Sequence, residues 1–226
     1  MGEMGIFQTM YSARAMRRFK TDPVPDAIIS KILDAAIRAP SAGNAQDWLF
    51  VVITDAAQRQ RVADIYRRAS MWVRQVCESK EPPEHMDAAH YQRFWKSGTY
   101  LHEHMAEAPV LIVPCLHLRP RNLPASLPEE ARAAMDRESP WRAGASIYPA
   151  VQNIILACRA LGLGTVLTTN HMLLEDEMKQ ALGLGADMMT FGLMPVGYPV
   201  GKFGQVVRKP IAEVAFRDRF SQSWHE

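Results

Sequence analysis

The sequence predicts an α+β domain, in which helices and strands are intermixed without alternating in regular β-α-β units. The chain of 226 residues is long enough for a single domain, residues 1–226, with a sizeable core. Its hydrophobic fraction of 48% is sufficient to fill that core. Stretches of helical periodicity are interspersed with short apolar runs rich in β-branched residues, and no internal repeat is present.

The first helix is expected over residues 4–18, where apolar and basic residues recur at helical spacing. In such a helix Ile6, Met10 and Met16 would face inward. The Asp-Pro-Val-Pro sequence at residues 22–25 should end it, because a proline disfavours the helical conformation in the residue before it.

A second helix is expected to follow, with Asp26 as its N-cap. The spacing predicts a buried stripe that consists of Ile29, Ile32, Leu33 and Ala36. Pro40 should end this helix, and the continuous apolar run at residues 48–53 is typical of a central strand. A third helix with a charged outer face is expected over residues 56–76.

Residues 78–139 differ in character from the rest of the chain. Helical periodicity fades, two adjacent prolines interrupt the sequence, and four aromatic residues follow at Tyr91, Phe94, Trp95 and Tyr100. Part of this range is either an ordinary irregular helix pair or a mobile lid over a pocket. The range also contains a second expected strand at 109–115 and a surface excursion at 119–139 that is rich in proline, arginine and glutamate.

Glycines punctuate the remaining third of the chain, where they are expected to end helices. The expected elements are a helix over 144–161 capped by Gly162, a strand at 164–169, a helix over 176–182 closed by Gly183, and a strand at 188–196 followed by a tail.

Composition excludes several classes of protein. A formal net charge of +2 is too small to indicate a nucleic-acid or anionic-membrane partner. The N-terminus does not resemble a signal peptide, and no apolar stretch approaches the length of a membrane-spanning helix. The three cysteines are odd in number and widely spaced, which favours reduced thiols and a soluble cytoplasmic protein. The histidines between residues 85 and 104 lack suitably spaced carboxylate or cysteine partners, so no metal site is expected.

Familiar catalytic motifs are also missing from the sequence. The glycines of Gly162-Leu-Gly164 follow a helix and precede a strand, which reverses the order of a dinucleotide-binding fingerprint. There is no Walker lysine motif, His-Glu-x-x-His, Cys-x-x-Cys or serine nucleophile elbow. Any chemistry is therefore expected to come from a bound cofactor.

Two short motifs flank the second expected helix. Before it stand Arg14, Arg17 and Arg18, and two converging guanidinium groups suit a phosphate dianion, which they can bind bidentately. After it comes Pro-Ser-Ala-Gly-Asn-Ala-Gln at residues 40–46, a loop of small residues and amides. Such a loop can approach a flat heterocycle closely and form hydrogen bonds with its polar edge.

Together these motifs resemble the opening of the nitroreductase family of FMN-dependent oxidoreductases. Two further blocks, residues 145–169 and 197–213, resemble the family's long central helix with its following strand and its Gly-Tyr-Pro…Arg-Lys-Pro…Glu ending. One position departs from the family pattern, because Ala15 stands where a serine is common. The backbone N–H of Ala15 could still contact a phosphate.

The resemblance implies a central mixed, mainly antiparallel sheet flanked by helices, in an intertwined homodimer with FMN at the interface. It implies that Arg14, Ala15, Arg17 and Arg208 bind the phosphate of FMN, while Arg18 is a surface or interface charge. It further implies that the flavin ring and ribityl chain contact Pro40, Ser41, Asn44, Thr168 and Thr169.

The activity implied is a ping-pong transfer of reducing equivalents from NAD(P)H through FMN to a small organic acceptor, such as a nitroaromatic or a quinone. Two alternatives remain open. One is the reductive dehalogenase or flavin-remodelling branch of the same family. The other is a non-catalytic flavin-binding or storage protein.

Overall fold

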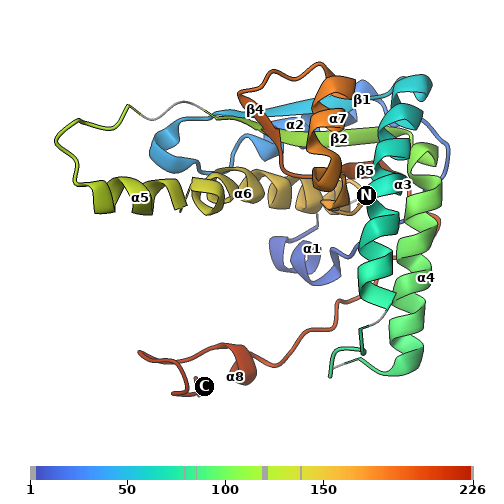
Figure 1. The fold of residues 1–226 in the computed structure, drawn as a ribbon. Coiled ribbons are helices and arrows are strands. Elements are labelled where there is room, and N and C mark those ends of the chain that lie inside the picture. The colour runs from blue at the N-terminus through green and yellow to red at the C-terminus, as the bar shows by residue number, and fades with distance from the viewer. Residues whose placement is uncertain (1–3, 79, 85, 119–121, 138, 225–226) are drawn as a thin grey trace.

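A computed structural model of the protein describes residues 4–78, 80–84, 86–118, 122–137 and 139–224. Its centre is a sheet with the strand order β1-β2-β5-β3, in which β4 is a further partner of β2 (Figure 1). The strands are β1 (Trp48–Ile53), β2 (Val110–His117), β3 (Gly164–Thr165), β4 (Met188–Thr190) and β5 (Met194–Gly197). Every pairing between these strands is antiparallel, which confirms the expected α+β class and mainly antiparallel sheet.

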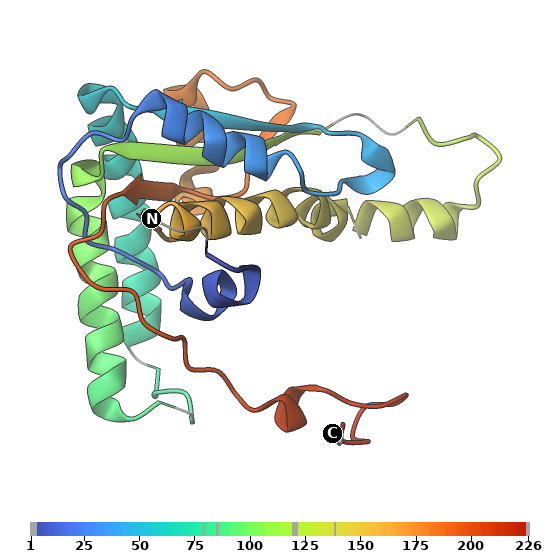
Figure 2. The same ribbon diagram turned by 180° about the vertical axis from the view of Figure 1, so that it is seen from behind.

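Helices cover both faces of this sheet (Figures 1 and 2). They are α1 (Ile6–Ser12), α2 (Asp26–Ala36), α3 (Ala56–Glu78), α4 (Ala88–His104), α5 (Glu129–Arg137), α6 (Ser139–Ala160), α7 (Glu175–Leu182) and α8 (Ile211–Val214). Short 3-10 turns add η1 (Ala42–Asn44), η2 (Met105–Glu107) and η3 (Asn170–Leu174). The expected range 78–139 therefore contains α4, β2 and α5.

Strand β2 organises the core because nearly all of its residues are buried. Successive side chains of a strand point to opposite faces of the sheet. Leu111 and Val113 accordingly join one apolar cluster with α3 and α7, whereas Val110 and Ile112 join another with α2 and α6. This two-sided burial explains why the strand is a continuous apolar run in the sequence.

The single strand expected at residues 188–196 is two strands in the structure. Between β4 and β5 the backbone of Leu193 turns to Thr168, with which it exchanges hydrogen bonds of 2.8 and 3.1 Å. Pro114 lies opposite this break, and a proline has no N–H to donate to a neighbouring strand. The strand expected at 164–169 is also shorter in the structure. Only Gly164 and Thr165 form β3, and Thr168 forms an isolated bridge with Leu193.

The first helix ends at Ser12, so the expectation that it runs to residue 18 is wrong. Tertiary hydrogen bonds hold the following segment extended: the N–H of Met16 donates to Thr165 at 3.0 Å and that of Lys20 to Tyr198 at 2.8 Å. Phe19 also forms a bridge with Pro199. Residues 13–20 thus line the edge of the sheet beside β3 and β5, and this placement overrides the helical periodicity.

Helices α3 and α4 lie side by side and project beyond the sheet (Figures 1 and 2). The side chain of Asp87 caps α4 by accepting a hydrogen bond from the N–H of His90 at 2.6 Å. The aromatic-rich stretch is therefore a regular helix of 17 residues, although its periodicity is weak in the sequence. Whether it acts as a lid stays a prediction.

Other element boundaries differ modestly from expectation. Pro25, and not Asp26, occupies the N-cap position of α2, and its side chain forms no capping hydrogen bond. Helix α6 begins before residue 144 and contains Pro149 in its interior. The helix-ending glycines are confirmed, because Gly162 and Gly183 adopt positive φ angles of 78° and 68°.

Two segments expose apolar side chains. Ile6 and Met10 of α1 are 56% and 43% exposed, so their expected inward orientation is wrong within this chain. The C-terminal segment leaves the body of the molecule and exposes Val207 (88%) and Phe220 (84%) (Figure 2). Monomeric proteins rarely leave large apolar surfaces uncovered.

Among the described helices, none combines the length and the apolar character that crossing a membrane requires.

Candidate functional site

A buried polar cluster joins α3 to the loop that follows β3. The hydroxyl of Thr168 donates a hydrogen bond of 3.1 Å to the phenolic oxygen of Tyr66. The amide of Asn170 donates one of 3.0 Å to the hydroxyl of Ser70, one turn further along α3. Tyr66 is only 2% exposed, and this burial raises the pKa of its phenol. The cluster therefore holds Thr168 at a fixed position, while Thr169 beside it is exposed.

Arg17 lies next to this cluster and is half-buried. Burial lowers the pKa of its guanidinium group, the nearby Tyr66 opposes that change, and the positive charge of Arg14 adds to it. Among the described residues, neither arginine forms an ion pair with a carboxylate. Two neighbouring guanidinium groups without a counter-charge repel each other, so an anion bound between them would lower the free energy.

The C-terminal segment runs along the arginine segment. The N–H of Val206 donates to the carbonyl of Tyr11 at 2.9 Å, and that of Val200 donates to Arg18 at 3.1 Å. A Cβ atom on Gly204 would lie 3.9 Å from a guanidinium nitrogen of Arg14. Non-glycine side chains at that position would therefore reach towards the guanidinium group.

Arg208 and Ala15 are the other two residues that the family resemblance implies at the phosphate. Arg208 follows this contact closely in the chain, but its guanidinium group is exposed and donates to the carbonyl of Val207 at 2.8 Å. Its side chain is thus not directed at Arg14 within this chain. Ala15 is exposed between the two arginines.

The loop that carries Pro40, Ser41 and Asn44 lies at the opposite end of the sheet from the segment that links α1 to α2 and carries the arginines (Figures 1 and 2). There Ser41 helps to line a pocket of about 320 Å³ between this loop, the end of β2 and α6. The hydroxyl of Ser41 accepts a hydrogen bond of 3.0 Å from the N–H of Gln46. Asn44 and Gln46 both have positive φ angles, of 52° and 54°. Two such non-glycine residues in one loop indicate stored backbone strain, which is common at binding sites.

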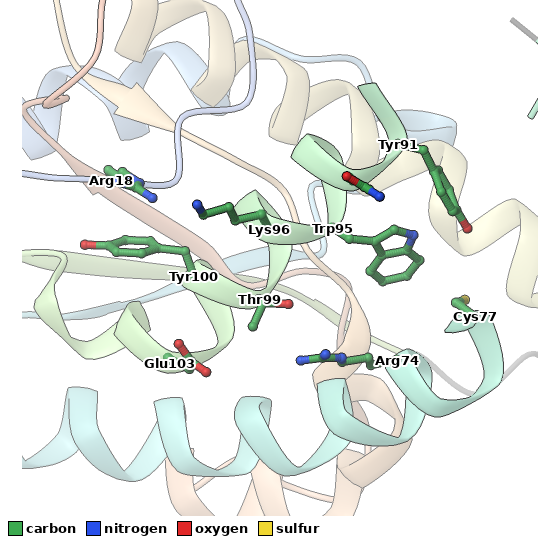
Figure 3. A pocket seen from close by; sticks show the side chains of 10 residues that line it. Arg18, Arg74, Cys77, Tyr91, Trp95, Lys96, Thr99, Tyr100 and Glu103 are labelled. Carbon is green, nitrogen blue, oxygen red and sulfur yellow. The ribbon is translucent and has the colours of Figure 1, made fainter. Parts of the chain in front are cut away.

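A pocket of about 570 Å³ lies between α3 and α4 (Figure 3). Sequence reasoning left a pocket in this region open as one alternative but did not identify the residues that line it. Its polar and aromatic lining includes Arg18, Arg74, Trp95, Lys96, Tyr100 and Glu103. Helical spacing was the available signal, because the lining residues of α4 recur at intervals of three and four, which places them on one side of the helix. Arg18, expected to be a surface or interface charge, lies with its guanidinium carbon 4.1 Å from the centre of the Tyr100 ring.

His102 connects this pocket with the buried polar cluster. Its ring packs edge-to-face against that of Tyr66, with the ring centres 5.6 Å apart. Burial lowers the pKa of His102, and the positive charges of Arg74 and Arg17 lower it further, while Glu103 opposes them. Arg17 and Arg74 therefore lie close enough to the same imidazole to affect it. Among the described residues, no cluster of histidine, cysteine, aspartate or glutamate is arranged to hold a metal ion.

Comparisons with known proteins identify the family to which the sequence is similar. The sequence model of the Nitroreductase family matches residues 10–198 of the chain. A protein from Thermus thermophilus named NADH dehydrogenase is 28% identical over 203 residues, which cover 89% of this chain and 90% of that protein.

Two solved structures show the same fold. A BluB-like flavoprotein from Clostridium difficile matches with a TM-score of 0.70 at 22% identity, covering 96% of this chain and 100% of that one. Iodotyrosine deiodinase bound to FMN and 3-iodo-L-tyrosine matches with a TM-score of 0.68 at 22% identity, covering 95% of this chain and 99% of that one.

Proposed function

Because the chain belongs to the nitroreductase family, we propose that it is an FMN-dependent oxidoreductase that uses NAD(P)H to reduce a small organic acceptor, such as a nitroaromatic or a quinone. One observation carries this proposal. Arg17 is half-buried beside Arg14, without a carboxylate partner among the described residues, and near Tyr66, whose phenol accepts a hydrogen bond from Thr168. A phosphate dianion beside a polar ring system would match both features.

The residues present fit FMN better than a dinucleotide. Arg14 and Arg17 would bind a terminal phosphate, with the backbone N–H of Ala15 between them. Thr168 and Thr169 would offer short hydroxyl groups to the edge of the flavin without covering its face. FMN, when bound, would supply the redox chemistry by accepting a hydride from NAD(P)H and passing the reducing equivalents to the acceptor. The protein's own residues bind, orient and shield the reactants.

We further propose that the functional unit is a homodimer. Pro40, Ser41 and Asn44 lie too far along the sheet to join Arg14 and Arg17 around one cofactor in one chain, so the partner subunit would supply the loop. The uncovered apolar side chains of α1 and of the C-terminal segment support an interface of this kind. A small rearrangement in such a dimer would also bring the exposed Arg208 side chain to the phosphate.

The test is the visible spectrum of the purified protein, followed by chromatography of the released chromophore. The proposal expects bound FMN, which bleaches rapidly when NADH or NADPH is added without oxygen. Release of FAD, or the absence of flavin even after reconstitution, would contradict it. Slow bleaching with both donors would instead favour a flavin-storage protein.

One observation favours the dehalogenase branch as a second candidate. The pocket between α3 and α4 contains aromatic side chains together with the cations Arg18 and Lys96 and the carboxylate of Glu103. Opposite charges beside aromatic rings suit an aromatic zwitterion. Release of iodide from 3-iodotyrosine by the reduced protein would establish this activity, and its absence would restrict the function to the first candidate.

A further inference from the structure

One side chain bridges the two segments that meet at the candidate phosphate site. Arg159 lies in the last turn of α6 and is half-buried. Its Nε donates a hydrogen bond of 2.9 Å to the hydroxyl of Ser12, the last residue of α1. Its guanidinium carbon also lies 4.1 Å from the centre of the Phe203 ring in the C-terminal segment. Arg159 therefore links residues near opposite ends of the chain.

The contact with Ser12 has a defined direction. The hydroxyl of Ser12 donates its only proton to the carbonyl of Gln8 at 2.7 Å, so its oxygen is left to accept from Arg159. Hydrogen bonds from a charged donor are shorter and stronger than those between neutral groups. The position also suits a cation, because the C-terminal end of a helix such as α6 carries partial negative charge. Arg159 thus fixes the end of α1, two residues before Arg14.

The contact with Phe203 fixes the C-terminal segment at the same place. Phe203 packs against the core cluster that includes residues of α3 and α7, and a guanidinium group over an aromatic ring is attracted to its face. The next residue, Gly204, adjoins Arg14, because a Cβ atom there would lie 3.9 Å from a guanidinium nitrogen of Arg14. The stretch that Arg159 holds is therefore the one that borders Arg14.

No carboxylate competes for these guanidinium groups. Among the described residues, neither Arg14 nor Arg159 forms an ion pair with an aspartate or a glutamate. Arg14 is exposed, so its long side chain loses rotamer freedom when it binds an anion. A fixed wall beside the guanidinium group reduces this loss, because fewer conformations are open to the side chain beforehand. Residues 203–206 form such a wall while they are held against α1.

We propose that Arg159 is a positioning residue of the candidate phosphate site. It holds the end of α1 and residues 203–206 together, and this arrangement orients Arg14 for an anion that Arg159 itself does not contact. A backbone hydrogen bond of 2.9 Å, from the N–H of Val206 to the carbonyl of Tyr11, closes the same junction. The inference rests on the proposed function for the identity of the anion, the phosphate of FMN, but not for the contacts between the two segments.

A comparison of FMN with riboflavin, which lacks the phosphate, isolates this effect. Fluorescence quenching gives both dissociation constants, and the ratio of the riboflavin value to the FMN value measures selectivity for the phosphate. Arg159→Met and Ser12→Ala should each lower this ratio about three- to tenfold, since each removes one partner of the same hydrogen bond. The affinity for riboflavin should change little, whereas a general loss of structure would weaken both flavins.

Arg38→Met is the matched control. It removes the same charge from an exposed arginine, which is paired with Asp34 one helical turn earlier and does not touch the junction. The selectivity ratio should therefore be unchanged in Arg38→Met. A decrease equal to that in Arg159→Met would show that net charge alone sets the ratio, and it would overturn the proposal.

Ser12→Ala separates positioning from direct binding, because it leaves the charge of Arg159 in place. A ratio that falls in Arg159→Met but not in Ser12→Ala would make Arg159 a ligand of the phosphate and overturn the proposal. An unchanged ratio in both variants would overturn it as well. In the double variant the ratio should fall no further than in Arg159→Met, because Ser12 acts only together with Arg159.

Amide hydrogen exchange tests the junction without any ligand. In Arg159→Met the N–H of Val206 should exchange about three- to tenfold faster, because the C-terminal segment is held less firmly. The amides of Met16 and Lys20, whose hydrogen bonds lie at the sheet edge, should keep their protection. An unchanged rate at Val206 would overturn the proposal. If the unmodified protein binds neither flavin while Val206 responds as expected, the junction stands and the proposed function fails.

Discussion

The hydroxyl of Thr168 donates a 3.1 Å hydrogen bond to the phenol of Tyr66, a residue 102 positions earlier in the chain. This bond joins the long helix α3 to the loop behind the sheet and lies beside Arg17. Because Tyr66 is almost completely buried, its phenol cannot exchange this partner for water. The position of Thr168 is therefore set by the packing of α3.

Replacing Tyr66 with Phe should lower the free energy of unfolding by about 1–2 kcal/mol, because the hydroxyl of Thr168 loses its buried acceptor. Urea unfolding of Tyr66→Phe, Thr168→Val and the double variant measures the coupling. The double variant should be destabilised by clearly less than the sum of the two single changes. Simple additivity would show that the hydrogen bond contributes nothing to stability.

Arg17→Gln should have opposite effects on folding and on binding. The ligand-free variant should be at least as stable as the unmodified protein, because a half-buried charge repelled by Arg14 is removed. Its dissociation constant for FMN should rise roughly ten- to a hundredfold, since one charge-assisted bond to the phosphate is lost. Fluorescence quenching of FMN measures the binding. Arg18→Gln, a charge change at the neighbouring position, should be much milder.

Arg208→Ala tests whether the C-terminal segment reaches the phosphate. If the exposed guanidinium group turns to the cofactor in the assembled protein, FMN should bind about ten- to a hundredfold more weakly in Arg208→Ala. Unchanged affinity in this variant, alongside a clear loss in Arg14→Ala, would restrict the phosphate site to the N-terminal segment.

The apolar C-terminal segment should be required for dimer formation. The double change Ile211→Asp and Val214→Asp places two charges on α8, where both residues are more than half exposed. Sedimentation velocity at micromolar concentration should then show a shift towards monomer. The control is Val200→Asp, which alters an equally exposed apolar residue outside α8. A dimer that persists in the double variant would exclude α8 from the interface.

His171 should make the fold sensitive to acid. Its Nε2 lies 3.0 Å from the hydroxyl of Thr190, whose single proton is donated to Glu175, so Nε2 must carry the imidazole proton. Nδ1 is buried without a partner among the described residues. Protonation there would bury an unsatisfied charge, and burial accordingly lowers the pKa of His171 from 6.5 to about 4.

Because the pKa is lower in the folded state, the unfolded chain binds this proton first as the pH falls. The contribution to stability is complete above pH 6.5 and is lost progressively towards pH 4. The full loss amounts to about 3 kcal/mol. Urea unfolding as a function of pH should show this slope, and His171→Gln should abolish most of it. His90→Gln, an exposed histidine change on α4, should retain it.

The elements that the sequence predicts well are those whose own side chains form the core. The stripe of α2 and the apolar run of β2 follow from local periodicity, as do the glycine-ended helices. The end of α1 does not, because hydrogen bonds from Met16 and Lys20 to residues near the other end of the chain decide it. The split between β4 and β5 likewise depends on Leu193 pairing with Thr168.

The candidate site likewise combines residues that a local sequence pattern reveals with residues that only tertiary contacts bring together. Arg14 and Arg17 could be singled out because charged residues in a short motif are visible in the sequence. Tyr66 could not, since a tyrosine within a helix gives no sign of which hydroxyl it will meet. The α3–α4 pocket combines one residue of the N-terminal segment with two distant helices, and only the fold brings Arg18 to Tyr100.

The extended segment at residues 13–20 has a consequence for synthesis of the protein. Its backbone partners, Thr165 and Tyr198, are translated long after the segment itself has left the ribosome. Met16 and Phe19 are both buried in the folded protein. Their side chains therefore remain exposed to solvent until most of the chain has been synthesised. A product truncated before Tyr198 would leave the arginine pair without its supporting strand edge. If Arg14 and Arg17 bind the cofactor phosphate as proposed, a chain truncated before Tyr198 should bind the cofactor more weakly than the intact chain.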